Sequence, residues 1–185
     1  MFAQTKYRSA FLTNDSVLLN AFIVVLSSVI LGVISQVAVH LWWPVPITLQ
    51  SAMVVLLGLT TGSKRAAAAV VLYLLEGAAG LPVFAGGLAG LPILIGPSAG
   101  YLWGFVPAAF FAGFLMEKGM ARNVLTTFSA AIAGSTIIFI VGVVHLQGFV
   151  GWEKAYTLGV QPFLIIEPIK LLIASALAIS AWKQA

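Results

Sequence analysis

Residues 16–40 read SVLLNAFIVVLSSVILGVISQVAVH and contain no charged side chain. The charge-free stretch continues to residue 63, and two more follow at 77–116 and 123–152. A transmembrane helix needs about 20 consecutive, mostly apolar residues, because the hydrocarbon core of a bilayer is about 30 Å thick. The first stretch has room for two such helices, the second for one helix and a loop, and the third for one. These stretches predict an all-α integral membrane protein.

The composition of the whole chain agrees with this class. Of its 185 residues, 61% are hydrophobic and 8% are charged, whereas soluble domains carry about 25% charged residues. The chain has no cysteine and only two histidines, so we expect no disulfide, no metal site and no cofactor. Its net charge is +4, but the basic residues form no cluster, and we expect no nucleic-acid partner.

Breaks between the apolar segments predict six transmembrane helices within a single membrane domain. Pro44 and Pro46 end the first segment, because proline is not accommodated in a straight helix. Residues 1–15 are partly charged and lack an apolar core, so they are typical of a cytoplasmic N-terminal segment rather than a signal peptide. The spans are expected at about 16–40, 47–62, 65–79, 98–116, 123–146 and 162–182.

The basic residues indicate the orientation of these spans. Six spans place both termini on one side of the membrane. That side also receives most of the basic residues: Lys6, Arg8, Lys64, Arg65, Lys118, Arg122 and Lys183. The other side receives only Lys154. Because short cytoplasmic loops carry an excess of lysine and arginine, both termini are expected in the cytoplasm.

The segment between the third and fourth expected spans, residues 80–100, is unusual. It contains six glycines and three prolines, yet it is apolar and uncharged. Irregular backbone at membrane depth is tolerated only where it is buried or lines a cavity. The segment therefore predicts a glycine- and proline-rich outward loop that covers a pocket open to the outside. A merely buried connector is the alternative.

The last expected span contains two charged residues, Glu167 and Lys170. They are three positions apart and therefore share one helix face, where they can form an ion pair. Charges inside a membrane are costly and are usually functional. If they face the pocket, Lys170 can neutralise a substrate carboxylate and Glu167 can accept hydrogen bonds from N–H groups. A purely structural ion pair is the alternative.

Most of the further candidate pocket residues are neutral. Thr48, Gln50 and Tyr73 supply donors and acceptors near the outer ends of the second and third spans. The acidic residue Glu76 lies close to the loop. Aromatic side chains are expected to wall the pocket, although each is also typical of membrane interfaces or packing: Phe84, Tyr101, Trp103 and Trp152.

Five segments of the chain can be compared with known families: residues 44–50 (PVPITLQ), 73–77 (YLLEG), 80–87 (GLPVFAGG), 96–105 (GPSAGYLWGF) and 159–164 (GVQPFL). In this order they resemble the BioY family, the biotin-binding S components of energy-coupling-factor (ECF) transporters.

The resemblance implies a six-helix protein of the bacterial cytoplasmic (inner) membrane. It would bind biotin at its outer face and partner an ECF transmembrane coupling protein and two ATP-binding subunits. Glu167 and Lys170 match the family's acidic residue three positions before a lysine, where the family more often has aspartate. Gly86, Gly87 and Ser98 belong to the matched loop, which more often has threonine at position 98. The family's alanine-x-x-x-alanine docking pattern on helix 1 has only a weak substitute here, Ser28 with Gly32.

Three other functions are open at this point. An S component for a different vitamin would have the same architecture. An intramembrane serine hydrolase could use Ser98, because residues 96–100 (GPSAG) fit the G-x-S-x-G pattern, with His145 as the base. A channel would need polar residues along several helices, and the first, fourth and fifth spans have few. The chain lacks the G-x-x-x-x-G-K-[ST] loop, so ATP would be used by a partner, and we expect no enzyme.

Overall fold

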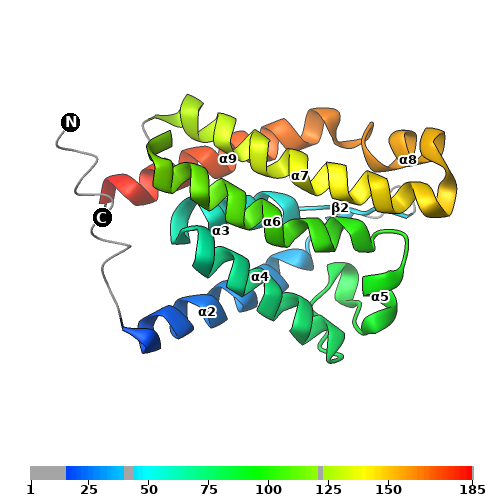
Figure 1. Cartoon of the computed structure of the whole chain (residues 1–185), viewed down its shortest axis with the longest axis horizontal. Helices are drawn as coiled ribbons and strands as arrows, with labels where there is room; N and C mark the ends of the chain where they lie inside the picture. Colours follow the sequence, from blue (N-terminus) through cyan, green and yellow to red (C-terminus); the bar gives the residue numbers. More distant parts are fainter. Residues whose placement is uncertain (1–15, 40–43, 121–122, 185) are drawn as a thin grey trace.

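The computed structural model describes residues 16–39, 44–120 and 123–184. The expected cytoplasmic segment 1–15 and the tryptophans at 42 and 43 lie outside these residues. The chain is mainly helical (Figure 1). Its elements are α2 (Val17–Ser35), β1 (Ala38–Val39), β2 (Ile47–Thr48), α3 (Gln50–Thr61), α4 (Ser63–Ala78), the 3-10 turn η1 (Ala85–Gly87), α5 (Leu91–Ile95), α6 (Ala99–Leu115), the π-turn η2 (Met116–Met120), α7 (Val124–Val150), α8 (Trp152–Gly159) and α9 (Phe163–Gln184).

The first helix is shorter than the sequence predicted. Its start is capped by Ser16, whose Oγ accepts a hydrogen bond from the Leu19 amide. It ends at Ser35 rather than near residue 40, because residues 38–39 form a strand that pairs antiparallel with Ile47–Thr48. Because of the same pairing, residues 47–48 are extended, although they were predicted as helix, and α3 begins only at Gln50. The two prolines before β2 favour this extended backbone.

Four helices among the described residues are long and apolar enough to cross a membrane: Val17–Ser35, Ala99–Met120, Val124–Val150 and Phe163–Trp182. The other two predicted spans correspond to α3 and α4, which have 12 and 16 residues. At 1.5 Å per residue these helices are only about 18 and 24 Å long, less than the hydrocarbon thickness of about 30 Å. The structure therefore shows a multi-helix membrane protein, and the six-span count stays a prediction.

Small residues let the central helices approach closely. A side chain at Gly58 on α3 would collide with the carbonyl of Ala109 on α6. Gly104 on α6 also packs closely against the backbone of Ile138 on α7. Membrane helices associate through such close backbone contacts, because burial from lipid gives little hydrophobic gain. These contacts set α6 beside α3 and α7 (Figure 1).

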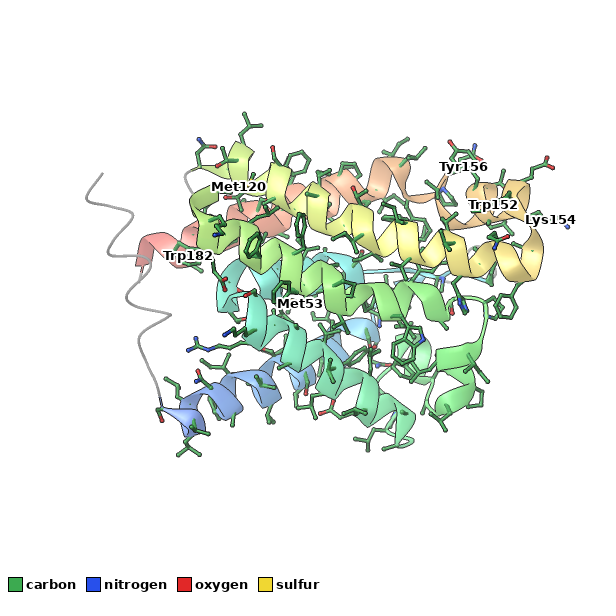
Figure 2. The ribbon with its side chains drawn as sticks, viewed as in Figure 1. Met53, Met120, Trp152, Lys154, Tyr156 and Trp182 are labelled. Atoms are coloured by element: carbon green, nitrogen blue, oxygen red, sulfur yellow. The ribbon has the colours of Figure 1, made fainter. Side chains whose placement is uncertain are left out.

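The two ends of the bundle differ. The short helices α5 and α8 lie at one end, and the start of α2 and the end of α9 lie at the other (Figure 1). Figure 2 shows Trp152, Lys154 and Tyr156 on α8 far from Met120 and Trp182 at the opposite end. Helix α8 was not predicted from the sequence. It follows α7, which extends to Val150, four residues past its predicted end.

The glycine- and proline-rich segment after α4 folds into η1 and α5, joined by tight turns. Gly86 and Gly90 have φ values of 69° and 91°, which favour glycine. Trp103 on α6 donates a hydrogen bond from Nε1 to the carbonyl of Leu94, 2.9 Å away, and so ties α5 to α6. The segment thus has a defined conformation, including one short helix.

Candidate functional site

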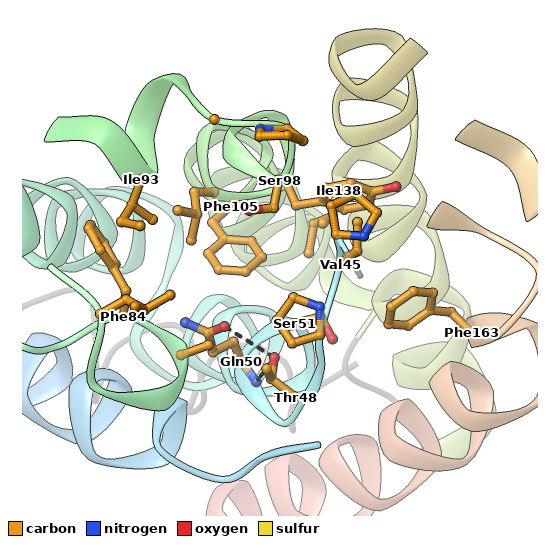
Figure 3. Close-up of a pocket in the computed structure, with 18 of the residues that line it drawn as sticks. Val45, Thr48, Gln50, Ser51, Phe84, Ile93, Ser98, Phe105, Ile138 and Phe163 are labelled. Carbon is orange, nitrogen blue, oxygen red and sulfur yellow. Dashed lines mark hydrogen bonds between the residues drawn. The ribbon is translucent and has the colours of Figure 1, made fainter. Parts of the chain in front are cut away.

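A cavity of about 310 Å³ lies between the β2–α3 junction, the segment 84–98 and helices α6 and α7. Figure 3 shows its lining side chains, most of which are apolar. Phe105, Ile138 and Phe163 form walls from three different helices. A mostly apolar cavity with a few placed polar groups is typical of a small-molecule site.

Polar groups enter this cavity mainly from the start of α3. Thr48 Oγ1 accepts a hydrogen bond from the backbone N–H of Gln50 at 3.2 Å. It donates one to the side-chain oxygen Oε1 of Gln50 at 3.1 Å. Gln50 Nε2 donates to the Tyr73 hydroxyl at 2.6 Å. These bonds fix the orientation of the buried Gln50 amide (Figure 3). A side-chain amide has two donor hydrogens and two acceptor lone pairs, so one of each is left for a ligand.

The ion pair predicted on the last span is formed. Lys170 Nζ lies 2.6 Å from Glu167 Oε2, and the two residues are 8% and 5% exposed. Lys170 also donates to the Thr48 carbonyl and to Ser51 Oγ, both at 2.8 Å. Its three N–H donors are therefore all satisfied. Ser51 in turn donates to Glu167 Oε2 at 3.0 Å.

The pair lies directly behind the cavity wall. Thr48 and Ser51 line the cavity. Glu167 and Lys170 do not line it, but they are hydrogen-bonded to these two residues. On its other side Glu167 lines a second cavity of about 130 Å³ between α7 and α9. There its Oε1 accepts a hydrogen bond from Ser135 at 2.9 Å. The structure thus places both side chains behind the wall of the main cavity, because their hydrogen bonds to Thr48 and Ser51 hold them there.

The other predicted residues divide into three groups. Thr48, Gln50, Phe84, Ser98 and Tyr101 line the main cavity. Tyr73 is buried behind Gln50, and Gly86 and Gly87 form the turn next to the lining residue Ala85. Trp152 does not line it, because it lies on α8 with 63% of its surface exposed.

Two aromatic residues fix elements around the cavity. Tyr101 donates from its hydroxyl to the Gly159 carbonyl at 2.9 Å, which ties α6 to the end of α8. Phe84 meets the Tyr73 ring edge-on, with 5.5 Å between the ring centroids. Glu76, which was expected close to the loop, accepts a hydrogen bond from Ser28 on α2 at 2.8 Å.

The surroundings of Ser98 do not match a hydrolase nucleophile. A nucleophile elbow needs a strand before the serine, but residues 91–95 form the helix α5. His145 Nε2 lies 3.0 Å from the Gly96 carbonyl, so this nitrogen is already hydrogen-bonded to the backbone. Among the described residues, no three His, Asp or Glu side chains group as a metal site would require.

Comparison with known proteins identifies the family and the fold of the chain. The model of the BioY family matches residues 6–185. The chain belongs to the BioY family. Its relatives include the biotin transporter BioY of Thermotoga maritima, 40% identical over 74% of this chain and 80% of that protein. The biotin transporter BioY of Rhizobium etli is 34% identical over 89% and 91% of the two chains.

The BioY fold is also shared with a crystal structure of the S-component for biotin from an ECF-type ABC transporter. The two structures superpose with a TM-score of 0.84 over 93% of this chain and 95% of that chain. Their sequence identity is 21%. The likeness therefore extends over almost the whole architecture described above.

Sequence reasoning missed several residues of this BioY site. Ser51 lies on the cavity wall and bonds both members of the ion pair, and Ser135 bonds Glu167 from α7. A usable signal was present, because each is a small polar residue in an otherwise apolar helix, where a buried hydroxyl needs a partner. The sequence carries no such signal for Phe105, Ile138 and Phe163. They lie in helices rich in apolar residues, so their residue type does not show which of them line a cavity.

Proposed function

We propose that the chain captures biotin from the outer side of the bacterial cytoplasmic membrane and delivers it across that membrane. It would act as the S component beside an ECF transmembrane coupling protein and two ATP-binding subunits. In this proposal the protein is a single membrane domain with six spans, of which α3 and α4 are the two short ones. Both termini are cytoplasmic, and the segment 80–98 faces outward.

One observation carries the proposal: a mostly apolar cavity with amide and hydroxyl groups on one wall and a buried lysine directly behind them. Biotin combines an apolar thioether ring with a ureido group and one carboxylate. The cavity offers a matching partner for each part. The names of the two relatives described above support the same ligand.

The ligand's polar ends are assigned to different groups. Gln50, Thr48 and Ser98 exchange hydrogen bonds with the ureido group. The carboxylate binds beside Ser51, where Lys170 supplies the positive charge and Glu167 accepts the hydrogen bond of the serine. Phe84 and Tyr101 enclose the thioether ring. The donors of Lys170 and Ser51 are already used, so the contribution of Lys170 is the attraction between its charge and the carboxylate.

The distribution of lysines along the bundle supports the orientation. Lys64 is in the first turn of α4, and Lys118 lies in η2, whose last residue Met120 is near the end of the molecule that holds Trp182 (Figure 2). Lys154 lies at the opposite end (Figure 2). The end with more lysines is the cytoplasmic one by the positive-inside rule.

The test compares binding of labelled biotin and biotin methyl ester to the purified chain. Lys170→Ala is expected to weaken biotin binding by about tenfold more than ester binding, because only the free acid carries the charge that Lys170 stabilises. The double variant Glu167→Gln with Lys170→Met removes both charges and so avoids leaving one buried and unpaired. It should bind the two ligands almost equally.

Lys154→Ala is the matched control, because Lys154 is exposed on α8. It should leave both affinities unchanged. An equal loss for acid and ester in Lys170→Ala would reject the carboxylate assignment. Failure of the unmodified chain to bind biotin, with binding of another vitamin instead, would reject the proposed ligand.

A further inference from the structure

The end of α2 is hydrogen-bonded to the wall segment, defined here as residues 81–88, which contributes Phe84, Ala85 and Leu88 to the cavity. Ser35 donates from its hydroxyl to the Val83 carbonyl. The Gln36 side-chain amide lies 3.3 Å from the carbonyls of both Pro82 and Phe84. The last residue of α2 and the capping residue after it thus hold three consecutive carbonyls of the wall segment.

Both residues also have a second partner within α2 itself. Ser35 Oγ lies 2.6 Å from the Gly32 carbonyl. Gln36 Nε2 lies 2.9 Å from the same carbonyl and 2.8 Å from Ser35 Oγ. A hydroxyl has one hydrogen to donate and an amide has two, so these donors are shared between α2 and the wall segment. They can leave the segment and remain bonded within the helix.

Two of the three carbonyls of the wall segment can also lose these bonds without being left unpaired. The Phe84 carbonyl keeps a hydrogen bond from the Gly87 amide at 3.1 Å. Pro82 is exposed, so water can replace Gln36 at its carbonyl. Most groups on both sides thus keep a partner when these bonds break, which lowers the free-energy cost of moving the wall segment.

The wall segment controls the shape of the cavity through Phe84. This side chain is 1% exposed and lies over Gly77, where an added side chain would overlap its ring. It packs edge-on against Tyr73, whose hydroxyl accepts the hydrogen bond from Gln50. A shift of the wall segment would therefore move Phe84 and free the cavity-lining Gln50 amide.

We propose that Ser35 and Gln36 form a latch that holds the wall segment closed, and that breaking it is the step that lets a ligand enter and leave the cavity. Gln36 is thus a positioning residue, acting through Phe84. The proposal rests on the proposed function only for the identity of the ligand.

A disulfide can lock this latch. The chain has no cysteine of its own. An ideal Cβ built on Gly32 lies 3.4 Å from the Cβ of Val83, close to the separation of about 3.5–4.5 Å found in disulfides. The variant Gly32→Cys with Val83→Cys should therefore cross-link α2 to the wall segment under oxidation. Release of prebound labelled biotin should slow at least tenfold in the oxidised form and recover on reduction.

The opposite change should speed release. Gln36→Ala is expected to raise the dissociation rate of labelled biotin about three- to tenfold, because it removes the shared hydrogen bonds. Gln147→Ala is the matched control, because within the described residues the Gln147 side chain forms no hydrogen bond and does not line the cavity. It should leave the rate unchanged.

These outcomes separate the two proposals. If the unmodified chain binds no biotin, the proposed function fails. If biotin binds but leaves at the same rate from the oxidised and reduced double-cysteine variant, or if Gln36→Ala and Gln147→Ala release it equally fast, the latch is overturned.

Discussion

At the scale of single residues, the cavity depends on positions where a side chain is missing as much as on those that line it. Gly77 on α4 leaves the space that the Phe84 ring fills. That ring supports Tyr73, and Tyr73 holds the Gln50 amide. A glycine outside the cavity lining thus determines the orientation of Gln50, which lines the cavity.

Gly77→Ala should displace Phe84 and weaken ligand binding at least tenfold while the chain still folds. The physical reason is that the added methyl group would overlap the ring and force it toward the cavity. Gly148→Ala on α7 is the control, because an added methyl there has no neighbour within 4 Å, and alanine favours the helix over glycine. Titration of both purified variants with labelled biotin measures the effect. Equal affinities would contradict the role given to Gly77.

At the scale of elements, short helices are held by side chains from their neighbours. Helix α4 begins directly after Gly62, without a side-chain cap of its own. Glu117 from η2 supplies one, because its Oε1 accepts hydrogen bonds from the Ser63 amide and hydroxyl at 2.7 and 2.9 Å. A carboxylate at a helix N-terminus also interacts favourably with the helix dipole.

Glu117→Ala should destabilise the protein by about 1–2 kcal/mol, the usual cost of losing a cap, and lower the midpoint of thermal unfolding in detergent. Glu153→Ala is the comparison, because Glu153 is an exposed acid in the first turn of α8. Its loss should cost less, since exposed charges near a helix end contribute about 0.3–1 kcal/mol. A larger shift for Glu153→Ala would refute the capping role.

At the scale of the whole molecule, the two ends of the bundle differ in their chemistry. The end with α8 carries Trp152, Tyr156 and Lys154, and the opposite end carries Trp182 (Figure 2). Tryptophan and tyrosine are enriched at both membrane interfaces. The molecule therefore fits a bilayer with its helices running between these ends, and the orientation depends on the basic residues.

Single introduced cysteines test the orientation of the chain in the membrane. The chain has no cysteine of its own, so any labelling comes from the introduced one. In intact cells, Lys154→Cys should react with a membrane-impermeant maleimide, whereas Lys118→Cys should react only after the cells are opened. Both side chains are exposed, so each cysteine is reachable from its own side. Labelling of both positions in intact cells, or of Lys118→Cys alone, would overturn the proposed topology.

The sequence predicts the long helices well, because charge-free stretches leave few alternatives to a transmembrane helix. It also predicts the ion pair of Glu167 and Lys170, because two opposite charges three residues apart in an apolar helix are stabilised by pairing. It does not predict that Lys170 lies behind Ser51 and Thr48. That position depends on where α3 packs against α9, a contact between segments more than 100 residues apart.

Short elements were predicted poorly. The pairing of residues 38–39 with 47–48 replaced helical structure at two predicted span ends. A two-residue strand has too few positions to show an alternating pattern. Helix α8 was also missed, although its mixed polar and aromatic residues follow a helix-ending glycine, Gly151.

The arrangement of Glu167 and Lys170 on one helix also has a consequence for biogenesis. Because the two charges are only three residues apart, they can neutralise each other while α9 enters the bilayer, before α9 has packed against the other helices. A lysine and a glutamate on separate helices would each have to cross the hydrocarbon alone. The pair therefore lets the nascent chain carry its buried charges into lipid as a neutral unit, and the site is complete once α9 packs against α3 and its Ser51.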